Sequence, residues 1–254
     1  MQGKTPLQIC CAITVSIVFC STVGAQENPL GQPLLDAAGN IREDAFIRIP
    51  LRAEDQKYAD IDGYFDSASD NASGVAVMMG LIKHFAQIPR SQRRRNLIFM
   101  SSLGHHSGPG ARWLHDEKDS ALANTAMVIN LEHVAVVRTK YWGPSLRKMN
   151  AVSPMRWWLW GSEQLLDIVL DSFQNFNVAV TGDMENRASG EMGAVARDIT
   201  SLQVITSPEI KHTEQDTEEW VPMVGLEQIA RAYAKIIDGA NALHIDELRP
   251  ALSN

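Results

Sequence analysis

Residues that can bind a metal ion fall next to predicted elements of a single sheet. His105, His106, Glu132 and His212 each follow a buried apolar run, and Asp70 directly precedes a predicted helix. Because the carboxyl ends of strands in an α/β sheet meet at one edge, these side chains should converge there. Imidazole and carboxylate groups are zinc ligands. The pattern therefore indicates a metal site, although spacing alone leaves a structural role open for any single histidine.

The elements that would position these residues alternate between strand and helix. Apolar spacing predicts helices at 71–86, 111–122 and 224–242 and buried strands at 97–102, 126–131 and 202–206. This alternation is typical of an α/β fold with a mostly parallel central sheet and helices on both faces. The segment 138–190 is harder to assign. We expect its cluster Trp157-Trp158-Leu159-Trp160 to pack in the interior rather than to line a substrate pocket.

The N-terminus has the features of a secretory leader. Lys4 precedes an apolar stretch, and the small residues Val23-Gly24-Ala25 precede a polar segment. We therefore predict a signal peptide at 1–25, an N-terminal arm or remnant at 26–58 and a catalytic domain at 59–245. The protein would be secreted or periplasmic, with no membrane span after cleavage. An uncleaved N-terminal anchor is the alternative.

Composition narrows the chemistry. The three cysteines, Cys10, Cys11 and Cys20, all lie in the predicted leader, so the mature chain would have no disulfide, cysteine nucleophile or thiolate metal site. A net charge of -7 argues against nucleic acid as a partner, because phosphate binding needs a basic face. The basic run 93–95 favours an exposed turn before a strand. Any catalytic metal must then be held by His, Asp and Glu.

Three segments around these residues resemble metallopeptidase family 28, the group of zinc aminopeptidases, glutamate carboxypeptidases and glutaminyl cyclases. They are the segment from Asp62 to Ala76, the segment Asn130-Leu131-Glu132-His133 and the segment His212-Thr213-Glu214-Gln215-Asp216-Thr217. The resemblance covers about residues 59–240 in the order of the family. It implies the zinc-exopeptidase fold and a peptide substrate.

The resemblance also implies a role for each candidate residue. Two zinc ions would share Asp70, with Glu132 on one ion and His106 and His212 on the other. Asp62 and Asp216 would orient ligand imidazoles. Glu191 would meet a free amine of the substrate, with a solvated loop carboxylate as the alternative. His133, beside a predicted ligand, has either a supporting role at the site or none.

This chain departs from the family pattern at two motifs. The family has His-x-Asp where this chain has Asp60-Ile61-Asp62, so Asp60 would have to replace an imidazole ligand with a shorter carboxylate. The segment 54–59 that precedes Asp60 is also too polar for a central strand, which indicates a deletion in the N-terminal part. The family often has a Glu-Glu pair at the second motif, where this chain has His105 and His106.

His105 would be the general base at this second motif, since imidazole has a pKa near neutrality. A hydrogen bond within its own loop is the alternative role for His105.

Three functions remain open at this point. The first is a secreted zinc-dependent exopeptidase, an aminopeptidase, with water activated between two ions. The second is a degenerate pseudoenzyme with one zinc or none, in which the fold serves as a binding module. The third is a mononuclear acyltransferase of the glutaminyl cyclase kind.

Overall fold

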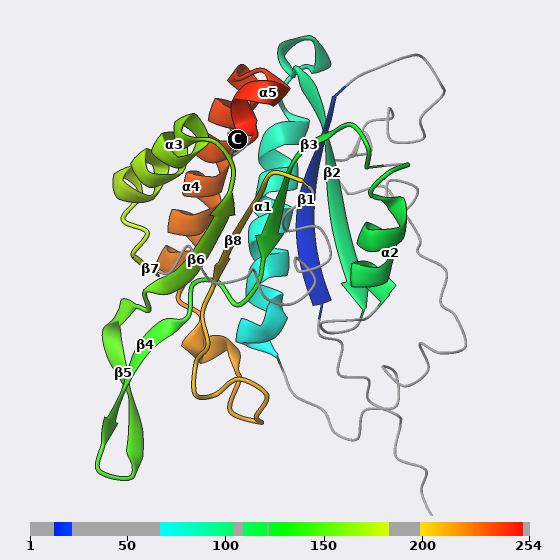
Figure 1. The fold of residues 1–254 in the computed structure, drawn as a ribbon. Helices are drawn as coiled ribbons and strands as arrows, with labels where there is room; N and C mark the ends of the chain where they lie inside the picture. Colours follow the sequence, from blue (N-terminus) through cyan, green and yellow to red (C-terminus); the bar gives the residue numbers. More distant parts are fainter. Residues whose placement is uncertain (1–12, 22–66, 104–108, 121, 183–198, 251–254) are drawn as a thin grey trace, which may run out of the picture.

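A six-stranded sheet forms the centre of the molecule, in the order β2-β1-β3-β8-β6-β7, and a separate hairpin, β4–β5, projects from one end of it (Figure 1). The computed structural model describes residues 13–21, 67–103, 109–120, 122–182 and 199–250. The strands are β1 Ile13–Ser21, β2 Arg95–Leu103, β3 Thr125–Leu131, β4 Val137–Trp142, β5 Ser145–Val152, β6 Met155–Trp160, β7 Val180–Gly182 and β8 Ser201–Ile205. The helices are α1 Ser73–Ala86, α2 Pro109–Glu117, α3 Glu163–Asn175, α4 Met223–Ala242 and α5 Ile245–Leu248, with short helical turns at Ala68–Ala72, Arg90–Gln92 and Glu218–Trp220.

The sheet is mixed. β3 pairs with β8 in parallel, as does β6 with β7, whereas β1 is antiparallel to both of its neighbours and β6 is antiparallel to β8. β2, β3 and β8 consequently run in the same direction. The predicted α/β fold is confirmed, and the segment that was hard to assign contains the hairpin, β6, α3 and β7.

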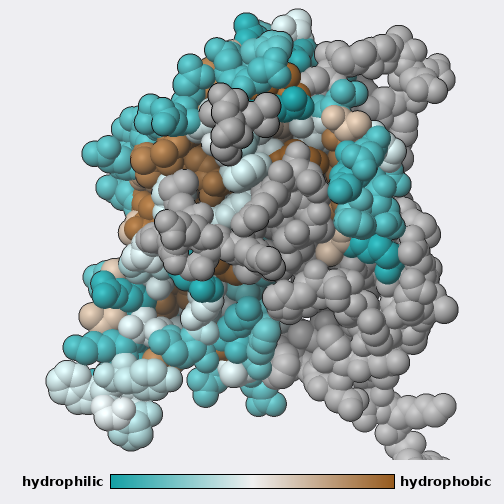
Figure 2. Space-filling view, viewed as in Figure 1, coloured by the Kyte–Doolittle hydropathy of each residue, from teal (hydrophilic) through white to brown (hydrophobic). Residues whose placement is uncertain are grey.

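Helices cover both faces of the sheet because the strand side chains alternate between two apolar cores. On β3, Met127, Ile129 and Leu131 face a core shared with α1, α3 and α4. Val128 faces the other core, with Leu114 of α2. The same alternation places Trp157 in the first core and Trp158 in the second, so this part of the tryptophan cluster packs in the interior as predicted. Figure 2 shows mostly hydrophilic residues over the described outer rim, with hydrophobic residues mainly between the elements.

The basic run before β2 is an exposed turn only in part: Arg94 lies in a bend and is exposed as predicted, whereas Arg95 is buried. Arg95 is the first residue of β2, and its guanidinium donates hydrogen bonds of 2.8 and 2.7 Å to the carbonyl oxygens of Ala240 and Leu243. Arg94 donates to the carbonyl of Ala242. These carbonyls lie at the C-terminal end of α4, where a cation is favoured by the helix dipole. The two arginines therefore fix the end of α4 against the start of β2.

Strand β1 is an interior strand of the sheet, between the edge strand β2 and β3 (Figure 1). Its residues pair along their whole length with β2, from Ile13 opposite Leu103 to Ser21 opposite Arg95. This segment belongs to the predicted leader, and cleavage after Ala25 stays a prediction. If it occurs, it removes the strand that joins β2 to the other four strands of the sheet.

No helix in the described ranges is long and apolar enough to cross a membrane.

Removing β1 should destabilise the fold. A chain that starts at Gln26 leaves the backbone groups of β2 and β3 on that side without their strand partners, which exposes two sheet edges. We expect its urea unfolding midpoint to lie clearly below that of the chain that retains residues 13–21. Equal midpoints for the two chains would show that β1 is not an integral strand.

Candidate metal centre

Asp70 lies in the turn Ala68–Ala72, just before α1, and only 6% of its surface is exposed. The turn is fixed by Asp216, whose carboxylate accepts hydrogen bonds of 2.7, 2.7 and 3.2 Å from the Ser69 N–H, the Ser69 hydroxyl and the Asp70 N–H. The backbone N–H of Ala68 also donates to the Asp216 carbonyl at 3.0 Å. The sequence predicts that Asp216 orients an imidazole, and this is corrected here: Asp216 positions the backbone that carries Asp70.

The two carboxylate oxygens of Asp70 face two different histidines. Oδ1 lies 2.8 Å from Nε2 of His133, and Oδ2 lies 2.8 Å from Nε2 of His212. His133 is fully buried, whereas the side chain of His212 is 57% exposed. Each oxygen of the buried carboxylate therefore meets a different imidazole.

Glu132 follows β3 directly and is 4% exposed. Its Oε2 accepts hydrogen bonds of 2.9 Å from the side-chain amides of Asn130 on β3 and Gln203 on β8. These two residues are opposite each other in the parallel pairing of the two strands. Its other oxygen, Oε1, lies 3.7 Å from Nε2 of His133. The two amides therefore hold the carboxylate so that Oε1 faces the Asp70 cluster.

The backbone of the site is held by a close approach between α1 and β3. Asn71 donates from its amide to the Leu131 carbonyl at 2.7 Å and accepts from the N–H groups of Gly74 and His133 at 3.2 and 3.1 Å. Gly74 allows this approach, because a Cβ on it would lie 2.3 Å from the Leu131 oxygen. Asn71 thus joins the Asp70 turn to the Glu132-His133 segment.

Asp70 stays ionised despite its burial. Burial by itself raises its pKa, but the hydrogen bond with His133 and the charges of His133, Lys211 and His212 lower the pKa to about 2 from an ordinary value of 3.8. The site therefore holds a permanent negative charge beneath the surface, which attracts a cation.

The structure brings Asp70, Glu132 and His212 together, with His133 between the first two. Asp60, Asp62, His105, His106 and Glu191 lie outside the described residues, so their predicted roles stay predictions. Sequence reasoning missed the contributions of Asn71, Asn130 and Gln203. The sequence carries only a weak signal for them: Asn71 is next to the predicted ligand Asp70, and Asn130 and Gln203 are polar residues within predicted buried strands.

These residues suit zinc by their donor types, but they are in direct contact with one another. In the part of the chain that the structure describes, no group of three or more His, Cys, Asp or Glu side chains could hold a metal ion as it stands. Two atoms bound to one tetrahedral zinc at about 2.0–2.1 Å lie about 3.3 Å apart. The contacts of 2.8 Å at Asp70 must therefore open by about half an ångström to admit an ion.

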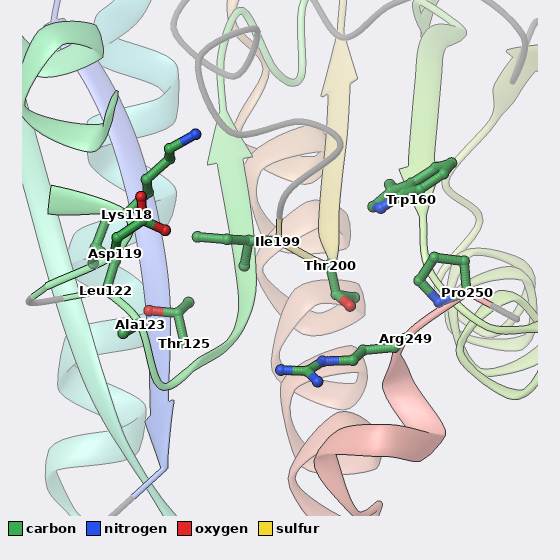
Figure 3. Close-up of a pocket in the computed structure, with 10 residues that line it drawn as sticks. All are labelled: Lys118, Asp119, Leu122, Ala123, Thr125, Trp160, Ile199, Thr200, Arg249 and Pro250. Carbon is green, nitrogen blue, oxygen red and sulfur yellow. The ribbon is translucent and has the colours of Figure 1, made fainter. Parts of the chain in front are cut away.

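A cavity of about 480 Å³ lies elsewhere, at the opposite end of β3 (Figure 3). It is lined by Thr125 at the start of β3 and Thr200 just before β8, with Trp160 and Arg249 on one side and Lys118 and Asp119 on the other. Since Glu132 follows the other end of β3, this cavity is separate from the Asp70 cluster. The candidate chemistry therefore does not use the cavity.

Residues 54–237, more than half of the chain, match the family model described as Peptidase family M28. This chain belongs to that family. Its fold is similar to a peptidase M28 precursor from Shewanella amazonensis, with a TM-score of 0.55 and 15% identity over 76% of this chain and 41% of that one. It is also similar to an aminopeptidase from Aneurinibacillus, with a TM-score of 0.50 and 14% identity over 74% and 41% of the two chains. A zinc aminopeptidase from Bacillus subtilis has a TM-score of 0.53 and 15% identity over 75% and 47%.

These likenesses at low identity show the M28 fold, and the chain spans less than half the length of each of these structures. No curated protein matches the sequence.

Gly74→Ala should destabilise the protein by about 1–3 kcal/mol, because the added methyl group collides with the backbone of β3. Gly80→Ala is a matched control in the same helix, where an added Cβ meets nothing within 4 Å. It should stabilise α1 by about 0.5–1 kcal/mol through helix propensity. Chemical denaturation of both variants checks this, and equal effects would contradict the close approach of α1 and β3.

The pKa of Asp70 predicts acid sensitivity of the metal-free protein. Its folded value of about 2 lies below the ordinary 3.8, so ionised Asp70 stabilises the fold above pH 3.8, and this stability is lost as the pH falls toward 2. The contribution is about 2 kcal/mol. In EDTA, urea unfolding between pH 5 and pH 2 should depend less on pH in Asp70→Asn than in the unmutated protein. An unchanged slope in the variant would rule out this contribution.

Proposed function

We propose that this protein is a secreted or periplasmic zinc-dependent exopeptidase. It would be an aminopeptidase, which removes residues from the amino end of a peptide. One observation carries the proposal: the buried, ionised Asp70 has a different imidazole at each of its two oxygens, with Glu132 next to one of them. Membership of the M28 family and the likeness to zinc aminopeptidases support it.

In this proposal Asp70 would be shared by two zinc ions, with Glu132 holding one of them and His212 the other. His106, outside the described residues, would join His212, and Asp60 would be a further ligand. Bound zinc supplies Lewis acidity, which lowers the pKa of water and polarises a peptide carbonyl.

The protein groups have separate tasks in this proposal. Asp216 holds the backbone of Asp70, and the Asn130 and Gln203 amides hold Glu132, so neither carboxylate has to reorganise during the reaction. His105 takes a proton from the attacking water and returns it to the leaving amine. Glu191 and Asp62 keep their predicted supporting roles, in substrate binding and ligand orientation.

A second candidate function is a binding module without catalysis. The specific observation in its favour is that Asp70 is in direct contact with His133 and His212 at 2.8 Å, with no space for an ion between them, in a chain with Asp60 at a histidine position. Such a protein would hold one zinc ion or none.

Zinc content and peptide cleavage test the proposed function together. After dialysis against trace zinc, we expect close to two zinc ions per chain and release of free amino acids from N-terminally unblocked peptides. Asp70→Ala should lose the bridged ions and more than about 100-fold of the activity. Asp167→Asn, an exposed acidic residue on α3, is the control that should change neither.

Three results would contradict the exopeptidase. Absence of zinc favours the binding module, as does zinc without cleavage of any peptide. Release of pyroglutamate from peptides that begin with glutamine, in place of a free amino acid, would indicate the acyltransferase.

A further inference from the structure

One ion of the proposed pair lacks an imidazole ligand at the position where the family pattern has one, since this chain has Asp60 there. We propose that His133 supplies that imidazole from a different position, the residue directly after Glu132. The inference rests on the proposed function for the presence of zinc, and it assigns to His133 a ligand role in place of a merely supporting one.

The position of the His133 ring is the first argument. Its Nε2 lies 2.8 Å from Oδ1 of Asp70 and 3.7 Å from Oε1 of Glu132, and the ring is completely buried. The three atoms come from a carboxylate, an imidazole and a second carboxylate, which is a donor set that zinc accepts without thiolates. The oxygen of Asp70 that faces His212 is the other one. His133 therefore lies on the Glu132 side of the predicted bridge, where the imidazole is missing.

The tautomer of the ring is the second argument. Nδ1 lies 3.0 Å from the carbonyl oxygen of Thr206, which can only accept a hydrogen bond, so Nδ1 carries the proton. Nε2 is therefore the ring nitrogen that faces the site, and it is buried without a geometric hydrogen-bond partner among the described residues. Its neighbours are carboxylate oxygens, which also cannot donate. A cation between these groups satisfies all three. A ring N–H bound to a backbone carbonyl is also the usual support of a histidine that binds metal.

The backbone of His133 is the third argument. Its φ of 47° is in the left-handed region, which a residue with a side chain adopts at a cost. Hydrogen bonds on both sides hold it there: its N–H donates to Asn71, and its carbonyl accepts from the N–H and the hydroxyl of Thr206. Hydrogen bonds to Asn71, in the turn before α1, and to Thr206, just after β8, therefore fix the backbone and the ring of His133.

Zinc binding by single-residue variants tests the assignment. His133→Asn keeps a donor where Nδ1 lies but lacks Nε2, so it should retain the Thr206 bond and lose about one zinc ion per chain, or at least tenfold in zinc affinity. His115→Asn, an exposed histidine on α2, controls for loss of a histidine as such. Circular dichroism and melting in EDTA establish that each variant is folded.

The outcomes separate this inference from the proposed function. If His133→Asn binds zinc like the unmutated protein, or if the unmutated protein binds none, His133 is not a ligand. If the variant loses one ion but the unmutated protein cleaves no peptide, the ligand role stands and the exopeptidase fails. Should the variant not fold, anomalous diffraction from zinc-loaded crystals of the unmutated protein decides. A zinc peak about 2.1 Å from Nε2 supports the ligand, and a peak elsewhere overturns it.

Discussion

The site depends on the burial of one ionised carboxylate. A charge beneath the surface costs free energy unless hydrogen bonds and opposite charges surround it, and the neighbours of Asp70 meet that need on every side. Asp216 holds its backbone, His133 and His212 face its two oxygens, and Asn71 connects its turn to β3. These partners come from the turn before α1, from the residue after Glu132 and from the segment after β8, so three separate parts of the chain are required for one side chain.

Much of this arrangement follows from the sequence alone. The alternation of apolar runs predicts β2, β3, β8, α1 and α4 close to their observed bounds, because buried strands and amphipathic helices leave strong patterns. It also brings Asp70, Glu132 and His212 to one place, since residues after parallel strands meet at one edge. The predicted signals and the observed elements agree where the pattern is long and regular.

The rest is set by tertiary contacts that leave no pattern. The apolar stretch of residues 13–21 has the composition of a leader, and only the gap between β2 and β3 gives it a place in the sheet. Asp216 binds backbone N–H groups, which carry no mark in a sequence. The direction of the His133 ring depends on a left-handed backbone and on the Thr206 carbonyl, so a residue beside a predicted ligand gave no sign of which way it faces.

The separation along the chain of the groups that meet at Asp70 has a consequence for the order of folding. Asp70 and His212 are 142 residues apart, and Ser69 and Asp216 are 147 apart. Closing such long loops is slow, and the contacts stabilise the protein only after the entropy of closure has been overcome. During synthesis from the N-terminus, the turn that carries Asp70 exists well before its partners do. The Asp70 site is therefore among the last features to form, and it is incomplete until the C-terminal third of a nascent chain has docked.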